Sequence, residues 1–398
     1  MSPMRVPRGR LFLLGLGGLA LLAALTGAAV LLGVPMPAVT TRLGAAHGVL
    51  MTLGFLGTLI ALERAVALGR WWGYGAPLAA GLGGLALMTG IAGIAGPLLV
   101  VGAAAYVAMY VAFDRIERSL HGTVQAVGAV AWLGAALLLL AGWSPPEAYP
   151  WLAAFLVLTI AGERLELSRL ASLTLGGRRA FVAAASVFVA GIGLTLVWLD
   201  AGIRLAGIGL VLLAVWLGRH DLARRTVRMR GVTRFVALSL LAGYAWLALA
   251  GAAWTAFGAS APPAAYDAML HALFLGFVIS MVFGHAPIIL PAVLRLPLPY
   301  HPRFYVHLGL LHAGLALRIV GGDLLGSDIA RLGGGILNVV ALLLFLVSSA
   351  VAVALAPAAT GFSRTGSRRT ARATARASAS EARPRSAPRE EAPPHRAG

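Results

Sequence analysis

The stretch that decides the fold is DAMLHALFLGFVISMVFGHAPIILPAVL, residues 267–294. It is apolar enough to cross a bilayer as a helix, which takes about 20 predominantly apolar residues. Yet it carries a histidine near each end, His271 and His285, and ionisable groups inside a spanning helix are costly and typically functional. At about 1.5 Å per residue, these two histidines lie about 21 Å apart along the helix.

Two other stretches resemble this one. The three segments read FLGTLIALER from Phe55, FLVLTIAGER from Phe155 and FVISMVFGHA from Phe277. Eight residues after each of these phenylalanines stands a polar group, namely Glu63, Glu163 and His285. The pattern indicates a weak internal repeat that is used three times.

The bulk composition is that of a membrane protein. Of the 398 residues, 59% are hydrophobic and 12% are charged, whereas soluble domains carry about 25% charged residues. The apolar runs are long and unbroken by alternation, which favours helices over a β-barrel. The absence of cysteine excludes disulfides, a thiolate haem ligand and iron–sulfur clusters. The formal charge of +18 lies mostly in loops and in the C-terminal segment, which fits membrane topology and not nucleic-acid binding.

The apolar runs predict an all-α polytopic membrane protein with twelve transmembrane helices. The predicted spans are residues 10–33, 43–67, 73–94, 97–113, 122–142, 148–168, 180–199, 202–218, 233–256, 266–294, 303–321 and 331–356. The phenylalanine-based repeat falls on spans two, six and ten. This placement predicts three pseudo-repeated units of four helices, with those three spans facing one central region.

The arginines predict the orientation. They gather in alternate loops, so the positive-inside rule places both termini in the cytoplasm, and an even number of spans requires the same. We therefore expect a multi-pass protein of the cell membrane, with residues 1–357 as its membrane domain. Residues 358–398 are rich in Arg, Ser and Pro and predict a disordered cytoplasmic tail.

Two histidines are expected near the outer face of the membrane. His47 lies about five residues into span two, and His271 about five residues into span ten. Two neutral imidazoles that face each other across a bundle can ligate a metal or a haem iron from opposite sides. The alternative is that each histidine hydrogen-bonds a backbone carbonyl or a hydroxyl on a neighbouring helix.

The three polar residues of the repeat are expected near the inner face of the membrane. We expect Glu63, Glu163 and His285 to converge on one another or on shared water, where they are proton-transfer candidates or a cation site. Arg64 and Arg164 follow the two glutamates directly and are expected to turn toward the lipid phosphates instead of pairing with them. The alternative is that each glutamate forms a structural salt bridge with a local arginine.

Two segments resemble known haem proteins. AAHGVLMTLGF (45–55) resembles the second helix of haem–copper oxidase subunit I, where an A-H-G stretch supplies a haem ligand. HALFLGFVISM (271–281) is similar to the tenth-helix region of the NnrS family, described as twelve-span proteins that bind haem and copper. The resemblance in the arrangement of twelve helices covers residues 10–356, but the specific motifs cover only about 25 residues.

The resemblance implies haem b between His47 and His271. The phenylalanine alignment matches Met269 to His47, which makes Met269 an alternative axial ligand. Arg318 and Arg42 are the expected partners of the haem propionates. Spans six and seven contain no histidine, so the oxygen-reducing haem–copper centre of the oxidases is excluded, and copper has no clear site.

The sequence therefore predicts a membrane haem-b-binding protein of the oxidase subunit I or NnrS type. Its expected role is electron transfer, haem handling or sensing, with a membrane or periplasmic redox partner and no nucleic acid. One alternative is a proton-coupled secondary transporter that uses Glu63, Glu163 and His285. The other is a non-catalytic assembly subunit of a membrane complex.

Overall fold

The computed structural model describes residues 7–168, 173–295 and 300–354, and no strand occurs among them. Residues Arg5–Ala356 form one compact unit. The segment predicted as a tail, 358–398, lies outside the described residues, as does the loop arginine Arg169.

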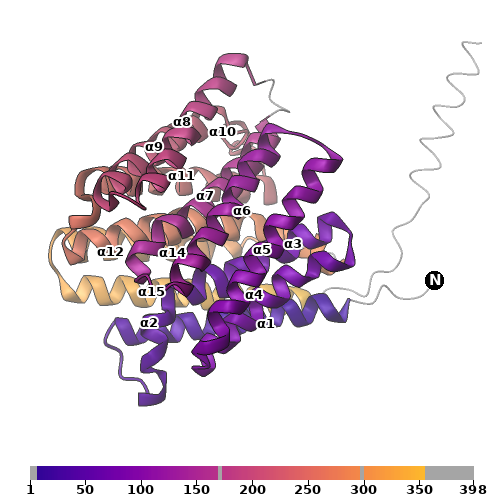
Figure 1. Cartoon of the computed structure of the whole chain (residues 1–398). Coiled ribbons are helices and arrows are strands. Elements are labelled where there is room, and N and C mark those ends of the chain that lie inside the picture. Colours follow the sequence, from indigo (N-terminus) through magenta and orange to yellow (C-terminus); the bar gives the residue numbers. More distant parts are fainter. Residues whose placement is uncertain (1–6, 169–172, 296–299, 355–398) are drawn as a thin grey trace, which may run out of the picture. The chain divides into compact units, whose positions relative to one another are not determined.

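The α-helices follow one another with short connections (Figure 1). They are α1 (Arg8–Leu31), α2 (Thr41–Val49), α3 (Thr58–Leu68), α4 (Gly75–Thr89), α5 (Ala92–Ile116), α6 (Leu120–Leu140), α7 (Pro145–Ser168), α8 (Leu175–Leu194), α9 (Leu199–His220), α10 (Ala223–Thr226), α11 (Val232–Phe257), α12 (Pro263–His271), α13 (Ser280–Leu294), α14 (Phe304–Ala316) and α15 (Asp328–Ala354).

Three π-helical segments interrupt or extend these helices. η2 (Leu50–Gly57) joins α2 to α3, η6 (Ala272–Ile279) joins α12 to α13, and η7 (Leu317–Leu324) continues α14. In the described part of the chain, three short 3₁₀ turns lie in connections, η1 (Ala38–Thr40), η3 (Trp71–Tyr74) and η5 (Gly258–Ser260).

Among the described residues, 10 helices are long and apolar enough to cross a membrane. The two predicted spans that are not among them are α4 and α7. α4 has only 15 residues. α7 has 24 residues but carries prolines and the charged pair Glu163 and Arg164, which lower its hydropathy. Because α7 is buried along most of its length, these polar groups face protein and not lipid.

Successive helices pack on one another along the chain, and the last returns to the first. α4 contacts α5, α5 contacts α6, α6 contacts α7, α9 contacts α11, and α15 contacts α1. Figure 1 shows α1 (indigo) and α15 (yellow) side by side. Glycines allow the closest crossings: a Cβ on Gly209 of α9 would lie 2.4 Å from the Cα of Phe188 in α8.

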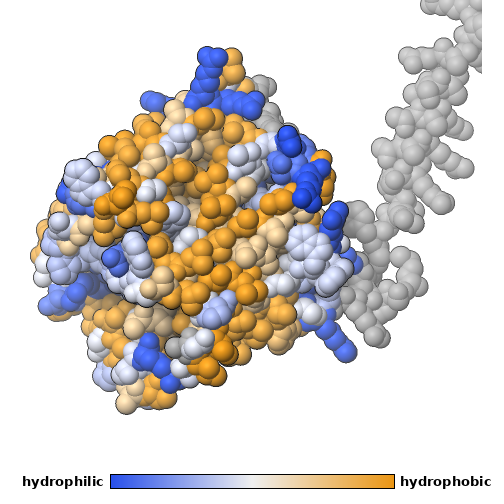
Figure 2. Space-filling view, viewed as in Figure 1, coloured by the Kyte–Doolittle hydropathy of each residue, from blue (hydrophilic) through white to orange (hydrophobic). Residues whose placement is uncertain are grey.

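The surface of the bundle is mostly apolar. In Figure 2 hydrophobic residues cover most of the visible face, and hydrophilic side chains gather at its rim. Large exposed apolar side chains include Leu19 and Leu22 of α1 and Leu344 and Val347 of α15. Such continuous apolar exposure is expected where helices face hydrocarbon.

Two of the three repeat copies share their local structure. α2 and α12 each have nine residues, and each is followed by an eight-residue π-helix and a further α-helix. The boundaries of the nine-residue helices and of the π-helices, and the start of the following α-helix, are displaced by the same interval that separates Phe55 from Phe277. π-Helices hold well under about 1% of residues in proteins, so their coincidence indicates a structural likeness. The third copy, in α7, is a continuous α-helix.

Candidate functional site: two cavities lined by the predicted polar residues

The first cavity, here the His47–His271 cavity, measures about 110 Å³. Its walls come from α1, α2, η2, α7, α12, η6, η7 and α15. Both predicted haem ligands, His47 and His271, line it together with Arg318. The structure thus brings to one place two histidines that are more than 200 residues apart in the sequence.

Each of these two histidines forms a hydrogen bond from one ring nitrogen to a backbone carbonyl oxygen. The Nδ1 of His47 lies 2.7 Å from the Ala24 carbonyl oxygen, and that of His271 lies 2.9 Å from the Asp267 carbonyl oxygen. A carbonyl only accepts, so both Nδ1 atoms carry the proton when the rings are neutral. Among the described residues neither Nε2 has a hydrogen-bond partner, so both Nε2 lone pairs remain for another group.

Gly48, the glycine that follows His47, allows α2 to lie close to the Tyr149 side chain of α7. A Cβ at Gly48 would lie 2.7 Å from the Tyr149 hydroxyl oxygen, which is shorter than real Cβ contacts. Gly48 and Tyr149 both line the cavity. The A-H-G motif therefore has a structural reason in this chain, because a larger residue at position 48 would force the Tyr149 side chain to move.

Arg318 is bound to an acidic partner that the sequence reasoning had not singled out. Its Nε and Nη2 each donate to the Asp267 carboxylate at 2.7 Å. The same carboxylate lies 3.2 Å from the Nδ1 of His271. Asp267 therefore connects Arg318 to His271, and its place one helical turn before His271 is the signal that would have revealed it.

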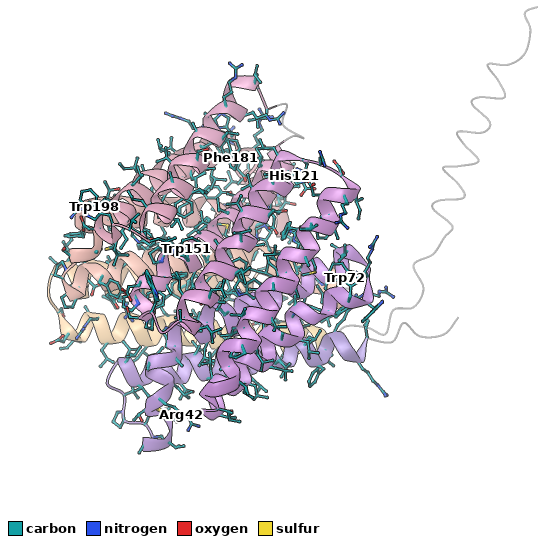
Figure 3. All side chains as sticks on the ribbon, in the orientation of Figure 1. Arg42, Trp72, His121, Trp151, Phe181 and Trp198 are labelled. Atoms are coloured by element: carbon teal, nitrogen blue, oxygen red, sulfur yellow. The ribbon has the colours of Figure 1, made fainter. Side chains whose placement is uncertain are left out.

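The other two residues predicted around the haem lie elsewhere. Arg42 is exposed and its Nε donates to the Met88 carbonyl at 3.1 Å. Figure 3 shows Arg42 at the edge of the bundle. Met269 is buried, its carbonyl accepts from the Trp254 indole, and its side chain is not part of the cavity wall.

The donor set of this cavity fits a bis-histidine iron, but the space is tight. Two imidazoles with Nδ1 held by carbonyls are the arrangement that orients histidine ligands toward a metal. Pockets for small molecules usually measure about 300–1,000 Å³, so a porphyrin would have to displace wall residues such as Leu270 and Phe274. A bare metal ion has less support, because the described residues contain no group of three or more His, Asp or Glu ligands.

The second cavity, here the Glu63–Glu163 cavity, is larger, at about 400 Å³. It lies between α1, η2 and α3, α7, η6 and α13, and α15. All three members of the predicted inner set, Glu63, Glu163 and His285, line it. The structure therefore places them on one shared wall.

The three repeat copies contribute equivalent residues to this wall. The positions four, five and eight residues after the repeat phenylalanines all line the cavity. They are Leu59, Ile60 and Glu63 in the first copy, Thr159, Ile160 and Glu163 in the second, and Met281, Val282 and His285 in the third. Because the same three positions recur, the three helices present the same face to the cavity.

Arg64 lies between the two glutamates, and the prediction that it turns toward the lipid phosphates is wrong. Its Nη2 donates to Glu163 and lies 3.6 Å from Glu63. The side chains of Arg64, Glu63 and Glu163 are only 16%, 28% and 19% exposed. Two carboxylates in a poorly solvated site attract a cation strongly, which outweighs snorkelling.

Arg164 was also expected to face the phosphates, and that prediction is wrong as well. The residue is 6% exposed, and its Nε has no hydrogen-bond partner in the described part of the chain. Arg164 and Glu163 both lie close enough to His285 for electrostatic interaction. The part of α7 that carries Glu163 and Arg164 is packed inside the bundle, whereas Glu166 of the same helix is exposed.

His285 has one satisfied and one unsatisfied ring nitrogen. Its Nδ1 lies 2.6 Å from the Met281 carbonyl oxygen. Its Nε2 is buried and has no hydrogen-bond partner among the described residues. His285 lines the Glu63–Glu163 cavity, but this nitrogen is enclosed by protein.

The remaining buried histidines have packing roles. Trp246 donates to the Nδ1 of His312 at 3.0 Å, and the Nε2 of that ring lies 3.3 Å from the Ser280 hydroxyl. His307 packs among aromatic rings, including Phe283 and Phe304.

The ten long apolar helices and the enclosed ionisable groups are those of a multi-pass membrane protein. The chain belongs to a family described as a domain of unknown function (DUF8744), whose match covers residues 10–355. No curated protein and no solved structure matches the chain. The likeness to the oxidase and NnrS families therefore remains a prediction from the two short motifs.

Proposed function

We propose that the protein binds haem b between His47 and His271 in the membrane. The observation that supports this is that both rings line one cavity while a backbone carbonyl holds each Nδ1, which leaves both Nε2 atoms for iron. Haem iron, when bound, supplies one-electron redox chemistry. The role that follows is electron transfer, haem handling or sensing.

In this proposal the surrounding residues orient the ligands. The Ala24 and Asp267 carbonyls fix the rings, and partners of this kind typically change metal affinity about 10–100-fold when they are removed. Arg318 is the propionate partner nearest the site, although Asp267 already engages it. Arg42 and Met269 have no part in the site.

The test is a visible spectrum of the full-length protein purified from haem-supplemented cells and titrated with haemin. We expect a bis-histidine haem spectrum that His47→Ala and His271→Ala each abolish. His220→Ala is the matched control, because the Nδ1 of His220 also lies near the carbonyl four residues before it, at 3.0 Å, outside both cavities. A colourless protein whose spectrum is that of free haemin at every ratio would refute the proposal.

We also propose that the helices form twelve spans in three units of four. The units would be α1 to α5, α6 to α9, and α11 to α15, with α2–η2–α3, α7 and α12–η6–α13 as their second spans. The shared boundaries of two copies and the equivalent wall positions of all three support this grouping. The positive-inside rule places both termini in the cytoplasm of the cell membrane.

A second candidate function is proton-coupled transport through the Glu63–Glu163 cavity. It is favoured by the two carboxylates that share Arg64 beside His285. In proteoliposomes with an internal pH-sensitive dye, proton flux is expected to fall at least tenfold in Glu163→Gln. Flux that is unchanged by this substitution would remove the transport function and leave the haem proposal standing.

A further inference from the structure

We propose that the end of the bundle where α9 ends and α11 begins binds an anionic phospholipid that carries two phosphates. Its acyl chains would lie on the exposed apolar faces of α9 and α11, and the guanidinium groups of Arg219 and Arg234 would bind its phosphates. These residues line neither cavity, so the inference depends neither on haem binding nor on proton transport.

Exposed arginines gather at this end of the bundle, and we call them the arginine patch. The patch consists of Arg178, Arg179, Arg219, Arg224, Arg225, Arg228, Arg230 and Arg234. The Trp216 indole in α9 donates to the Gly177 carbonyl at 2.7 Å, which brings the start of α8 next to the end of α9. α10 in turn packs against α11. Hydrophilic side chains stand out at the top of Figure 2, in the region where Figure 1 labels α8 and α10.

No exposed acidic group of α8 to α11 balances this charge. Among the described residues, none of the eight arginines forms an ion pair. The stretch 175–257 contains only two acidic residues, Asp200 and Asp221. Asp200 pairs with Arg204 near the opposite end of α9. Asp221 is buried, and its carboxylate accepts from the Tyr244 hydroxyl at 2.8 Å.

The charged residues at the end of α7 do not neutralise the patch either. The buried Arg164 interacts electrostatically with Tyr244, as Asp221 does, so its positive charge offsets that of Asp221. The exposed Glu166 directs its carboxylate to His121 of α6, 3.8 Å from the Nε2. The patch therefore keeps a large positive formal charge, which attracts anions.

Two arginines of the patch continue helix faces that are exposed to hydrocarbon. α9 exposes Ile208, Leu212 and Val215, which lie on one face of the helix. Arg219 follows four residues after Val215, on the same face. Arg234 lies eleven residues before the exposed Ala245 of α11, a spacing that also returns to the same face. Because α9 and α11 pack on each other, one lipid can reach both helices.

A phosphate matches the chemistry of these side chains. A guanidinium group binds phosphate through paired N–H donors. A lipid with two phosphates can engage the ends of both helices at once, and linking the two contacts strengthens binding beyond that of a single phosphate. Arg224 is partly engaged already, because its Nη1 donates to the Arg219 carbonyl at 3.2 Å.

An exposed apolar residue inside the patch favours a lipid over a soluble polyanion. Met229 stands between Arg228 and Arg230, and it is 56% exposed. Apolar surface interleaved with cations suits the boundary between head groups and acyl chains, where the methionine enters the apolar layer while the arginines reach the phosphates.

The experiment is a native mass spectrometry titration of the full-length protein in detergent. The probes are cardiolipin, which has two phosphates, phosphatidylglycerol, which has one, and the zwitterionic phosphatidylcholine, compared at equal phosphate concentration. We expect cardiolipin to bind about tenfold or more tightly than phosphatidylglycerol, and phosphatidylcholine to bind most weakly. Arg219→Gln and Arg234→Gln should each weaken cardiolipin binding about fivefold.

Arg115→Gln is the matched control. Arg115 is exposed and follows the exposed Val111 on one face of α5, but the exposed acids Asp114 and Glu117 lie beside it. This substitution should change cardiolipin affinity less than twofold, because the local charge there is already balanced.

Three results would overturn the proposal. Equal affinity for cardiolipin and phosphatidylglycerol would remove the requirement for two phosphates. An equal loss in Arg115→Gln and Arg219→Gln would show that any surface arginine has the same effect. Displacement of cardiolipin by a single-stranded DNA oligonucleotide at equal phosphate concentration would show a general polyanion surface and not a lipid site.

Discussion

Arg64 illustrates how a single residue can be misjudged from its neighbours in the sequence. As the residue directly after Glu63 it appears free to reach the lipid phosphates, but Glu163 from α7 fixes it inside the bundle. The attraction of two poorly solvated carboxylates outweighs the tendency of a long side chain to reach water.

Arg64→Met should destabilise the protein by about 3–5 kcal/mol, because it leaves two enclosed carboxylates without a cation. The Arg64→Met/Glu163→Met double variant should be less destabilised than the two single variants predict together. Arg331→Met is the control, since its partner Asp328 is exposed and such pairs contribute about 0–1 kcal/mol. Thermal unfolding in detergent compares the four variants with the unsubstituted protein. Equal losses for the Arg64 and Arg331 single variants would show that Arg64 has no special role.

At the scale of elements, close helix crossings depend on glycines that the hydropathy pattern does not distinguish from their neighbours. Gly209 lets α9 approach the backbone of α8 at Phe188. Gly218, in the same helix, has no atom within 4 Å of an added Cβ. The two glycines therefore differ in packing although both lie inside α9.

Gly209→Ala should destabilise the protein by about 1–3 kcal/mol, because the added methyl group forces α8 and α9 apart. Gly218→Ala should be neutral or stabilising by up to about 1 kcal/mol, since alanine favours helix more than glycine does. Differential scanning fluorimetry in detergent compares the two variants. If the two variants shift the unfolding temperature by the same amount, the close approach of α8 and α9 does not depend on Gly209.

For the molecule as a whole, the decisive question is whether α4 and α7 cross the membrane. The natural chain has no cysteine, so single cysteines can report sidedness without background. Arg118, between α5 and α6, has an 89% exposed side chain, and Ser260, after α11, is also exposed.

With twelve spans and a cytoplasmic N-terminus, a membrane-impermeant maleimide applied to intact cells should label Ser260→Cys and not Arg118→Cys. The two positions are separated by five helices if α7 crosses, and by four if it does not. Labelling of both positions, or of neither, would therefore show that α7 does not cross. Labelling of Arg118→Cys alone would show that α7 crosses and α4 does not. Labelling after membrane disruption confirms that each cysteine is reactive.

The sequence by itself determined the helical class and singled out the polar residues that line the two cavities. Long unbroken apolar runs indicate membrane-spanning helices, because a helix satisfies the hydrogen bonds of its own backbone N–H and C=O groups in the bilayer. The spacing from phenylalanine to a polar group found Glu63, Glu163 and His285, since equivalent positions on similar helices face the same way.

Only the tertiary structure decided which groups meet. It placed His47 and His271 on one cavity and connected His271 to Arg318 through Asp267. It also turned Arg64 inward and kept Arg42 and Met269 away from the site. Such outcomes depend on how helices far apart in the chain cross and rotate against one another, and the pattern within a single helix does not contain that information.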